Sequence, residues 1–203
     1  MERQTVHLFV LNTLADWETG YAIAGINNPL WQAQPGRYQV ATVGASGKPV
    51  RTIGGVTILP DMTLDDLAPA QSAMLILPGG DTWDADENSA VAARVREFLA
   101  AGVPVAAICG ATAFLARAGI LDERRHTSNA PEYLRATGYG GEALYQDQPA
   151  VTDGDLITAT STAPVDFAYQ IFKRLAVYDT RTLEAWYGLF KTGDPSYFFA
   201  LQQ

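Results

Sequence analysis

Short apolar runs that alternate with stretches of helical periodicity constrain the fold of this sequence more than any other feature. Runs of four to six residues suit strands better than helices, and strands that are apolar along their whole length are buried on both faces, as in parallel sheets. The apolar runs are 6–11, 38–43, 73–77, 104–108 and 156–159. The helical stretches between and after them are 16–27, 89–101, 111–118, 131–137 and 164–175. This alternation predicts an α/β fold, a three-layer α/β/α sandwich with a mostly parallel, flavodoxin-like central sheet.

Smaller elements complete the prediction. Gly54-Gly55 indicates a two-residue hairpin between 50–53 and 56–59, and a second hairpin surrounds Asp153-Gly154-Asp155. Residues 126–128 are predicted as a short strand. The aromatic tail, 177–203, has helical spacing and is expected to pack on its own domain, with a dimer contact as the alternative. No repeat or linker divides the chain, so we expect a single domain over 1–203 with a core of about 5–176.

Composition excludes several classes of function. Fourteen basic against twenty-two acidic residues give a net charge of −8, which argues against binding a nucleic-acid backbone. No apolar run is long enough to span a membrane, and the first residues lack a signal-peptide layout. One cysteine cannot form an internal disulfide, which favours the cytoplasm. With only His7 and His126 beside it, neither a metal site nor a cofactor is expected.

The single cysteine, Cys109, stands where the apolar strand 104–108 gives way to a helix. Such a turn is a nucleophile elbow, which lifts a nucleophile above the carboxyl edge of the sheet, where ligands bind in open α/β folds. Gly110 and Ala111 keep the next positions small, and the helix N-terminus favours a thiolate. The alternative is a buried structural cysteine, which is common for this residue type.

Leu77-Pro78-Gly79-Gly80 ends another predicted strand at the same edge. Consecutive glycines there let backbone N–H groups point into a cleft. We therefore expect the N–H groups of Gly80 and Gly110 to form an oxyanion hole, with Gly79 lining the pocket. Pro-Gly-Gly is also an ordinary turn sequence.

Together these segments resemble the ThiJ/PfpI superfamily, the cysteine branch of the class I glutamine amidotransferase-like fold, over about 5–176. The resemblance implies that a carboxylate after the first strand hydrogen-bonds the cysteine sulfur, and Glu18 holds that position. A buried, protonated Glu18 would have a raised pKa, and the sulfur that accepts its hydrogen bond a lowered pKa. Asp16 is interpreted as a helix N-cap, and Trp17 as core or pocket wall. An exposed first-turn role is the alternative for Glu18.

The histidine of this superfamily is where the sequence departs from the pattern. Gly110 follows Cys109, where some members have histidine, and Ser128 matches the histidine of the deglycase-like members. His126 lies two residues earlier, on the same face of the predicted strand, so it is a candidate catalytic residue and Ser128 a pocket candidate. A surface or structural histidine is the alternative for His126. His7 is interpreted as structural. Without a histidine base, peptide hydrolysis is not expected.

Two functions of different classes fit these residues. The first is a cysteine-dependent enzyme acting on a small electrophilic substrate, as a glyoxalase, hydratase or amidase, with the thiolate of Cys109 paired with Glu18. The second is a redox or stress sensor whose Cys109 oxidises to a sulfinate without turnover. A glutamine amidotransferase would need a His-Glu pair late in the chain, and none follows His126. The resemblance also implies a homodimer.

Overall fold

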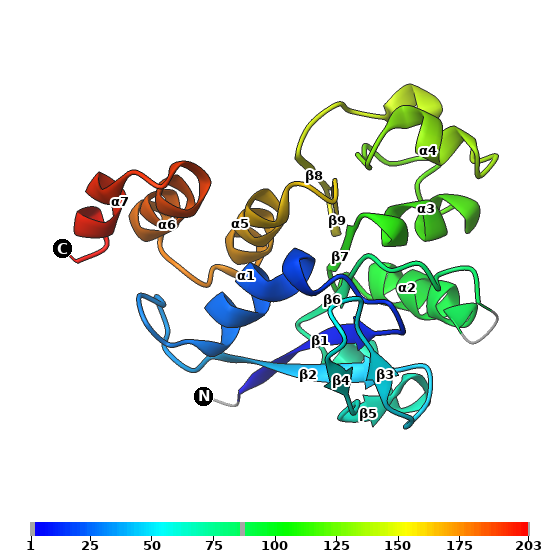
Figure 1. Cartoon of the computed structure of the whole chain (residues 1–203), viewed down its shortest axis with the longest axis horizontal. Coiled ribbons are helices and arrows are strands. Elements are labelled where there is room, and N and C mark those ends of the chain that lie inside the picture. The colour runs from blue at the N-terminus through cyan, green and yellow to red at the C-terminus, as the bar shows by residue number, and fades with distance from the viewer. Residues whose placement is uncertain (1–2, 86–87, 203) are drawn as a thin grey trace.

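The central feature of the structure, a computed structural model that describes residues 3–85 and 88–202, is a mostly parallel sheet between helical layers (Figure 1). Met1 and Glu2, part of the segment considered for a signal peptide, lie outside the described residues. In the described chain the sheet has seven strands in the order β5-β2-β1-β6-β7-β9-β8, all parallel to their neighbours except β8 against β9. The strands are β1 (Gln4–Val10), β2 (Tyr38–Gly44), β5 (Met62–Thr63), β6 (Met74–Leu77), β7 (Val105–Ile108), β8 (Ala150–Asp153) and β9 (Leu156–Ala159).

Helices cover the sheet and shield its apolar strands. Figure 1 shows α1 and α5 side by side on one face, and α2 and α3 on the other. Every residue of β6 and β7 is buried, as their continuous apolar sequences predict. The predicted three-layer sandwich is confirmed. The helices are α1 (Asp16–Asn27), α2 (Val91–Ala100), α3 (Gly110–Arg117), α4 (Pro131–Arg135), α5 (Pro164–Leu175), α6 (Thr180–Thr192) and α7 (Pro195–Ala200).

The strand order reverses between β1 and β6. From β1 the chain passes through α1 to β2 on one side, whereas β6 leads through α2 to β7 on the other. Connections that leave in opposite directions open a crevice at the carboxyl edge of the sheet. The segments that follow β1, β6 and β7 therefore meet there.

Three local predictions are wrong. Residues 126–128 form no named strand, because His126 makes only an isolated parallel bridge to Tyr145. The first hairpin has a longer loop than Gly54-Gly55 indicates, since β3 (Val50–Arg51) ends and β4 (Thr57–Ile58) begins with 52–56 between them. Asp16 does not cap its own helix. Its carboxylate accepts the Gly54 N–H at 2.8 Å, and so ties the start of α1 to the hairpin loop.

The aromatic tail forms α6 and α7, and α6 packs against α5. Asp166 of α5, which is buried, accepts hydrogen bonds from Tyr187 at 2.8 Å and from Lys191 at 2.7 Å. In the described part of the chain, no helix has both the length and the apolar character that crossing a bilayer demands.

Candidate active site

Cys109 forms the one-residue turn between β7 and α3. Its φ of 58° and ψ of −124° lie in a region that residues with a β-carbon rarely adopt. The chain can reverse direction there without a loop, which brings the side chain to the carboxyl edge of the sheet. The residue is half-buried.

Glu18, in the first turn of α1, lies beside this cysteine. The side chain is buried, at 1% exposure, and its Oε2 accepts the Gly79 N–H at 2.6 Å. A β-carbon placed on Gly79 would lie 2.7 Å from Cys109 Cβ and 2.7 Å from Glu18 Oε1. Gly79 is therefore the spacer that lets the carboxyl group and the cysteine approach each other, for which a residue without a side chain is required.

The environment raises the pKa of both groups of this pair. Burial raises the pKa of Glu18, although the Cys109 side chain and the Gly79 N–H oppose the rise. Burial also raises the pKa of Cys109 to about 11, and the nearby charge of Glu18 adds to that rise. The expected rise for Glu18 agrees with the structure, and the expected fall in the pKa of the sulfur is wrong. That expectation counted the hydrogen bond to the sulfur and neglected desolvation and the carboxylate charge.

Asn129 is a site residue that sequence reasoning missed. Its Nδ2 donates to Cys109 Sγ at 3.4 Å, and its Oδ1 accepts the Ser161 N–H at 2.9 Å. The second bond orients the amide, because it places the acceptor end on the backbone and leaves the donor end for the sulfur. Its hydrogen bond lowers the pKa of Cys109, against the effect of burial. The signal in the sequence was one residue away, since Ser128 was matched to the family histidine.

Ser128 instead supports the turn from below. Its buried hydroxyl hydrogen-bonds the hydroxyl of Thr112 at 2.6 Å, and Thr112 donates to the Cys109 carbonyl at 2.6 Å. Ser128 therefore acts on the position of Cys109 through α3.

The two predicted oxyanion groups are neighbours in space. A β-carbon on Gly110 would lie 2.7 Å from the Gly80 carbonyl and 3.2 Å from Trp83 Cδ1. Trp83 is buried, and its indole N–H donates to the Pro78 carbonyl at 2.8 Å, which fixes the glycine turn against α3. The function of the Gly80 and Gly110 N–H groups as an oxyanion hole stays a prediction.

Among the described residues, neither histidine ring hydrogen-bonds the sulfur of Cys109. His126 is completely buried, with Nδ1 bonded to the Arg124 carbonyl at 2.7 Å and Nε2 to the Tyr139 hydroxyl at 3.1 Å. Burial lowers its pKa. His7 is also buried and bonds to the Ser72 hydroxyl at 2.5 Å. Both rings are used inside the fold, which favours the structural interpretation of His126.

Trp17 and Tyr133 also lie near this region. Trp17 is 56% exposed and lines an apolar groove along α1, so it is not a core residue. Tyr133 of α4 is close enough to Cys109 for the charge of the sulfur to contribute to a raised phenol pKa, of which burial is the main cause. No pattern in the sequence singled out Tyr133.

Comparisons with known proteins agree with this architecture. The sequence profile of the DJ-1/PfpI family matches residues 4–174. An uncharacterized protease of Bacillus subtilis, YoaZ, is 41% identical over 99% of this chain and 97% of its own length. Protein/nucleic acid deglycase 2 of Escherichia coli is 32% identical over 56% of this chain and 64% of its own. The crystal structure of a thiJ/pfpI family protein from Bacillus anthracis superposes with a TM-score of 0.92 at 42% identity, covering 100% of this chain and 98% of that one.

Proposed function

Because this chain belongs to the DJ-1/PfpI family, we propose that it is a cysteine-dependent enzyme acting on a small electrophilic substrate. Cys109 is the nucleophile and Glu18 the group that moves its proton. The observation that carries the proposal is the buried carboxyl group of Glu18 held against Cys109 across Gly79. Relatives named protease and deglycase support a cysteine enzyme without fixing its reaction.

The raised pKa values decide how a nucleophile is generated. A thiol with a pKa of about 11 is protonated at neutral pH, so the proton must leave as the sulfur attacks. Glu18 is the acceptor, because its own raised pKa makes the carboxylate a stronger base than an exposed one. The Asn129 amide then stabilises the thiolate by donating to it.

On an aldehyde or ketone, the first step forms the S–C bond and moves the carbonyl π electrons onto oxygen. The N–H groups of Gly80 and Gly110 are proposed to stabilise that oxygen, and Glu18 returns the proton to it. The product of this step is a neutral hemithioacetal, so atoms and charge balance.

Asn129 makes peptide hydrolysis a poor candidate. An amide neither takes up nor releases a proton near neutral pH, so it cannot protonate an amine leaving group as a histidine does. Small carbonyl compounds need no such leaving group. A glyoxalase-like reaction is therefore favoured over proteolysis.

The test is turnover of methylglyoxal, with lactate as the measured product. Wild-type protein is expected to form lactate, and Cys109→Ser to form none. Glu18→Gln keeps the size of the side chain but cannot carry the proton, so turnover is expected to fall by at least about a hundredfold. Lactate formed by Cys109→Ser at the wild-type rate would refute the proposal.

A redox sensor is the second candidate, and one observation favours it. Glu18 Oε1 is buried without a hydrogen-bond partner in the described part of the structure. A protonated Oε1 could donate to a sulfinate oxygen on Cys109, with peroxide supplying both oxygens. If methylglyoxal gives no lactate and peroxide adds two oxygens to Cys109 by mass spectrometry, the sensor replaces the enzyme.

A further inference from the structure

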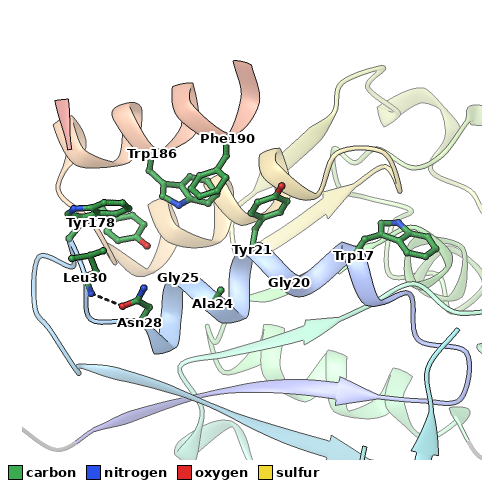
Figure 2. Close-up of a pocket in the computed structure, with 11 residues that line it drawn as sticks. Trp17, Gly20, Tyr21, Ala24, Gly25, Asn28, Leu30, Tyr178, Trp186 and Phe190 are labelled. Atoms are coloured by element: carbon green, nitrogen blue, oxygen red, sulfur yellow. Dashed lines mark hydrogen bonds between the residues drawn. The ribbon is translucent and has the colours of Figure 1, made fainter. Parts of the chain in front are cut away.

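An apolar groove of about 540 Å³ runs between α1 and α6 and is closed by Tyr178 and the segment after α1. Figure 2 shows Tyr21 of α1 facing Trp186 and Phe190 of α6, with Tyr178 at one end. The Tyr21 ring lies 5.3 Å from Phe190 and 6.2 Å from Trp186, centroid to centroid, in edge-to-face geometry. The volume lies within the range of small-molecule sites, roughly 300–1,000 Å³.

Two polar groups of otherwise buried side chains line this groove without partners. Tyr178 is 6% exposed and Trp186 is 4% exposed. Neither the Tyr178 hydroxyl nor the Trp186 indole N–H bonds to any described residue, and neither atom is itself fully buried, so both polar atoms are open to the groove. Both can donate, and the indole N–H can only donate. An occupant that supplies acceptor atoms would satisfy them.

The floor and one wall are also unusual. A β-carbon on Gly20 would meet no atom within 4 Å, so this face of α1 is open to the groove. Trp31, on the closing segment, has a φ of 66°, a strained conformation for a bulky residue. Strain of this kind is concentrated at functional sites. The α6 wall lies beyond the 4–174 match to the family, so the groove depends on the C-terminal extension.

We propose that this groove binds a flat aromatic molecule that carries a hydrogen-bond acceptor, such as an aryl ketone. Its rings pack against the cluster that Tyr21, Trp186 and Phe190 form, and its acceptor bonds the hydroxyl of Tyr178 or the indole N–H of Trp186. Binding is noncovalent and does not require Cys109, so the inference stands independently of the proposed enzyme activity.

The probes are 2-acetylnaphthalene and naphthalene, which share a ring system and differ in the acceptor. Binding is measured by isothermal titration calorimetry and by tryptophan fluorescence. Wild type and Cys109→Ser are expected to bind the ketone equally, and at least about fivefold more tightly than naphthalene, the effect of one hydrogen bond. Failure of the ketone to bind, or equal affinity for both probes, would overturn the proposal.

Three variants place the site. Gly20→Leu fills the groove from a helical position that favours leucine, and it is expected to abolish ketone binding without loss of thermal stability. Tyr178→Phe and Gly20→Ala keep the groove open. Tyr178→Phe is expected to reduce the preference for the ketone over naphthalene. Unchanged ketone affinity in Gly20→Leu would place the ligand elsewhere.

A second copy of the chain is the competing occupant of this surface. Sedimentation of the wild type and Gly20→Leu distinguishes the two. If the wild type is a dimer and Gly20→Leu a monomer, the groove is a subunit interface and the ligand proposal is wrong. If the oligomeric state does not change while ketone binding is lost, the proposal holds.

Discussion

The reactivity of Cys109 depends on two side chains that act in opposite directions. The carboxylate of Glu18 raises the pKa of the thiol, and the amide of Asn129 lowers it. Burial raises the pKa of Glu18, so a proton released by the sulfur has an unusually basic carboxylate beside it. Such a pair titrates as a unit, and its two protons belong to both groups.

The pH dependence of alkylation by iodoacetamide tests this coupling. Between the raised pKa of Glu18 and the Cys109 pKa of about 11, the wild-type pair shares one proton, so its thiolate fraction and alkylation rate are expected to stay nearly constant. In Glu18→Gln and Glu18→Leu no proton is shared, and the rate should rise about tenfold per pH unit up to the thiol pKa.

That thiol pKa should be lower than in the wild type, because removing the carboxylate removes a negative charge. Below the raised pKa of Glu18 the wild type should match Glu18→Gln, and above that pKa the wild type should be slower by a factor that grows with pH, because only the variant gains thiolate there. Glu18→Leu, which has no donor for the sulfur, should be slower than Glu18→Gln. Exposed Glu97→Gln serves as the control. Parallel profiles in all four proteins would mean that Glu18 and Cys109 are not coupled.

Asn129→Ala removes the donor from the sulfur. The thiol pKa is expected to rise, and the alkylation rate at pH 8 to fall about fivefold, the effect of one hydrogen bond of about 1 kcal/mol. The variant also loses the hydrogen bond to Ser161, and thermal unfolding of the same samples measures how much stability that loss costs. An unchanged rate in a stably folded variant would remove Asn129 from the site.

At the scale of elements, the site depends on how closely three segments approach. The start of α1 brings Glu18, the turn after β6 brings Gly79, and the turn between β7 and α3 brings Cys109. The Gly79 carbonyl also accepts the Ala15 N–H at 3.0 Å, which joins the β6 turn to the start of α1. The Asp16 carboxylate holds the same end of α1 to the hairpin loop, so hydrogen bonds on two sides set the position of Glu18.

Gly79→Ala should disturb this junction. Its methyl group would lie too close to both Cys109 and Glu18, so the variant is expected to lose about 1–3 kcal/mol of unfolding free energy. Its alkylation profile should also lose the constant region, because the pair is forced apart. Gly47→Ala is the matched control, since its nearest contact would be 3.9 Å away. Urea denaturation measures both, and equal stability of the two variants would contradict the packing argument.

At the scale of the whole molecule, the C-terminal helices are joined to the core by one buried carboxylate. Asp166 accepts hydrogen bonds from Tyr187 and Lys191 of α6. The rings of Phe172, Tyr178 and Trp186 pack against one another between α5 and α6. The attachment therefore combines a polar contact with aromatic packing. It also forms one wall of the apolar groove, so the extension contributes more than a covered end of the chain.

Asp166→Asn tests the polar part of this attachment. The amide keeps an acceptor for Tyr187 but loses the charge that pairs with the partly exposed Lys191. The variant is expected to lose about 1 kcal/mol of unfolding free energy and to show faster hydrogen exchange in α6 than in β7. Wild-type exchange in α6 would show that the Asp166 charge is not needed to hold the helix, which the Tyr169–Glu184 hydrogen bond and aromatic packing also join to α5.

The sequence by itself determined the layers and the strand-to-helix turn at Cys109. Apolar runs without polar interruptions can be buried only on both faces of a sheet, and burial is a local consequence of composition. It also singled out Glu18 as the candidate partner of Cys109, through family resemblance. Predictions for 126–128 and for Asp16 failed because both segments bond to partners distant in the chain.

Only the tertiary structure decided which groups act on the sulfur. Asn129 reaches Cys109 across twenty positions of sequence, and its orientation depends on Ser161, a further thirty-two positions along the chain. Desolvation likewise belongs to the assembled molecule, because the water that Cys109 and Glu18 lose is displaced by several elements at once. Local patterns carry no information about such contacts. For that reason the sequence could single out Cys109 as the candidate nucleophile, whereas the packing of the fold decided which groups surround its sulfur.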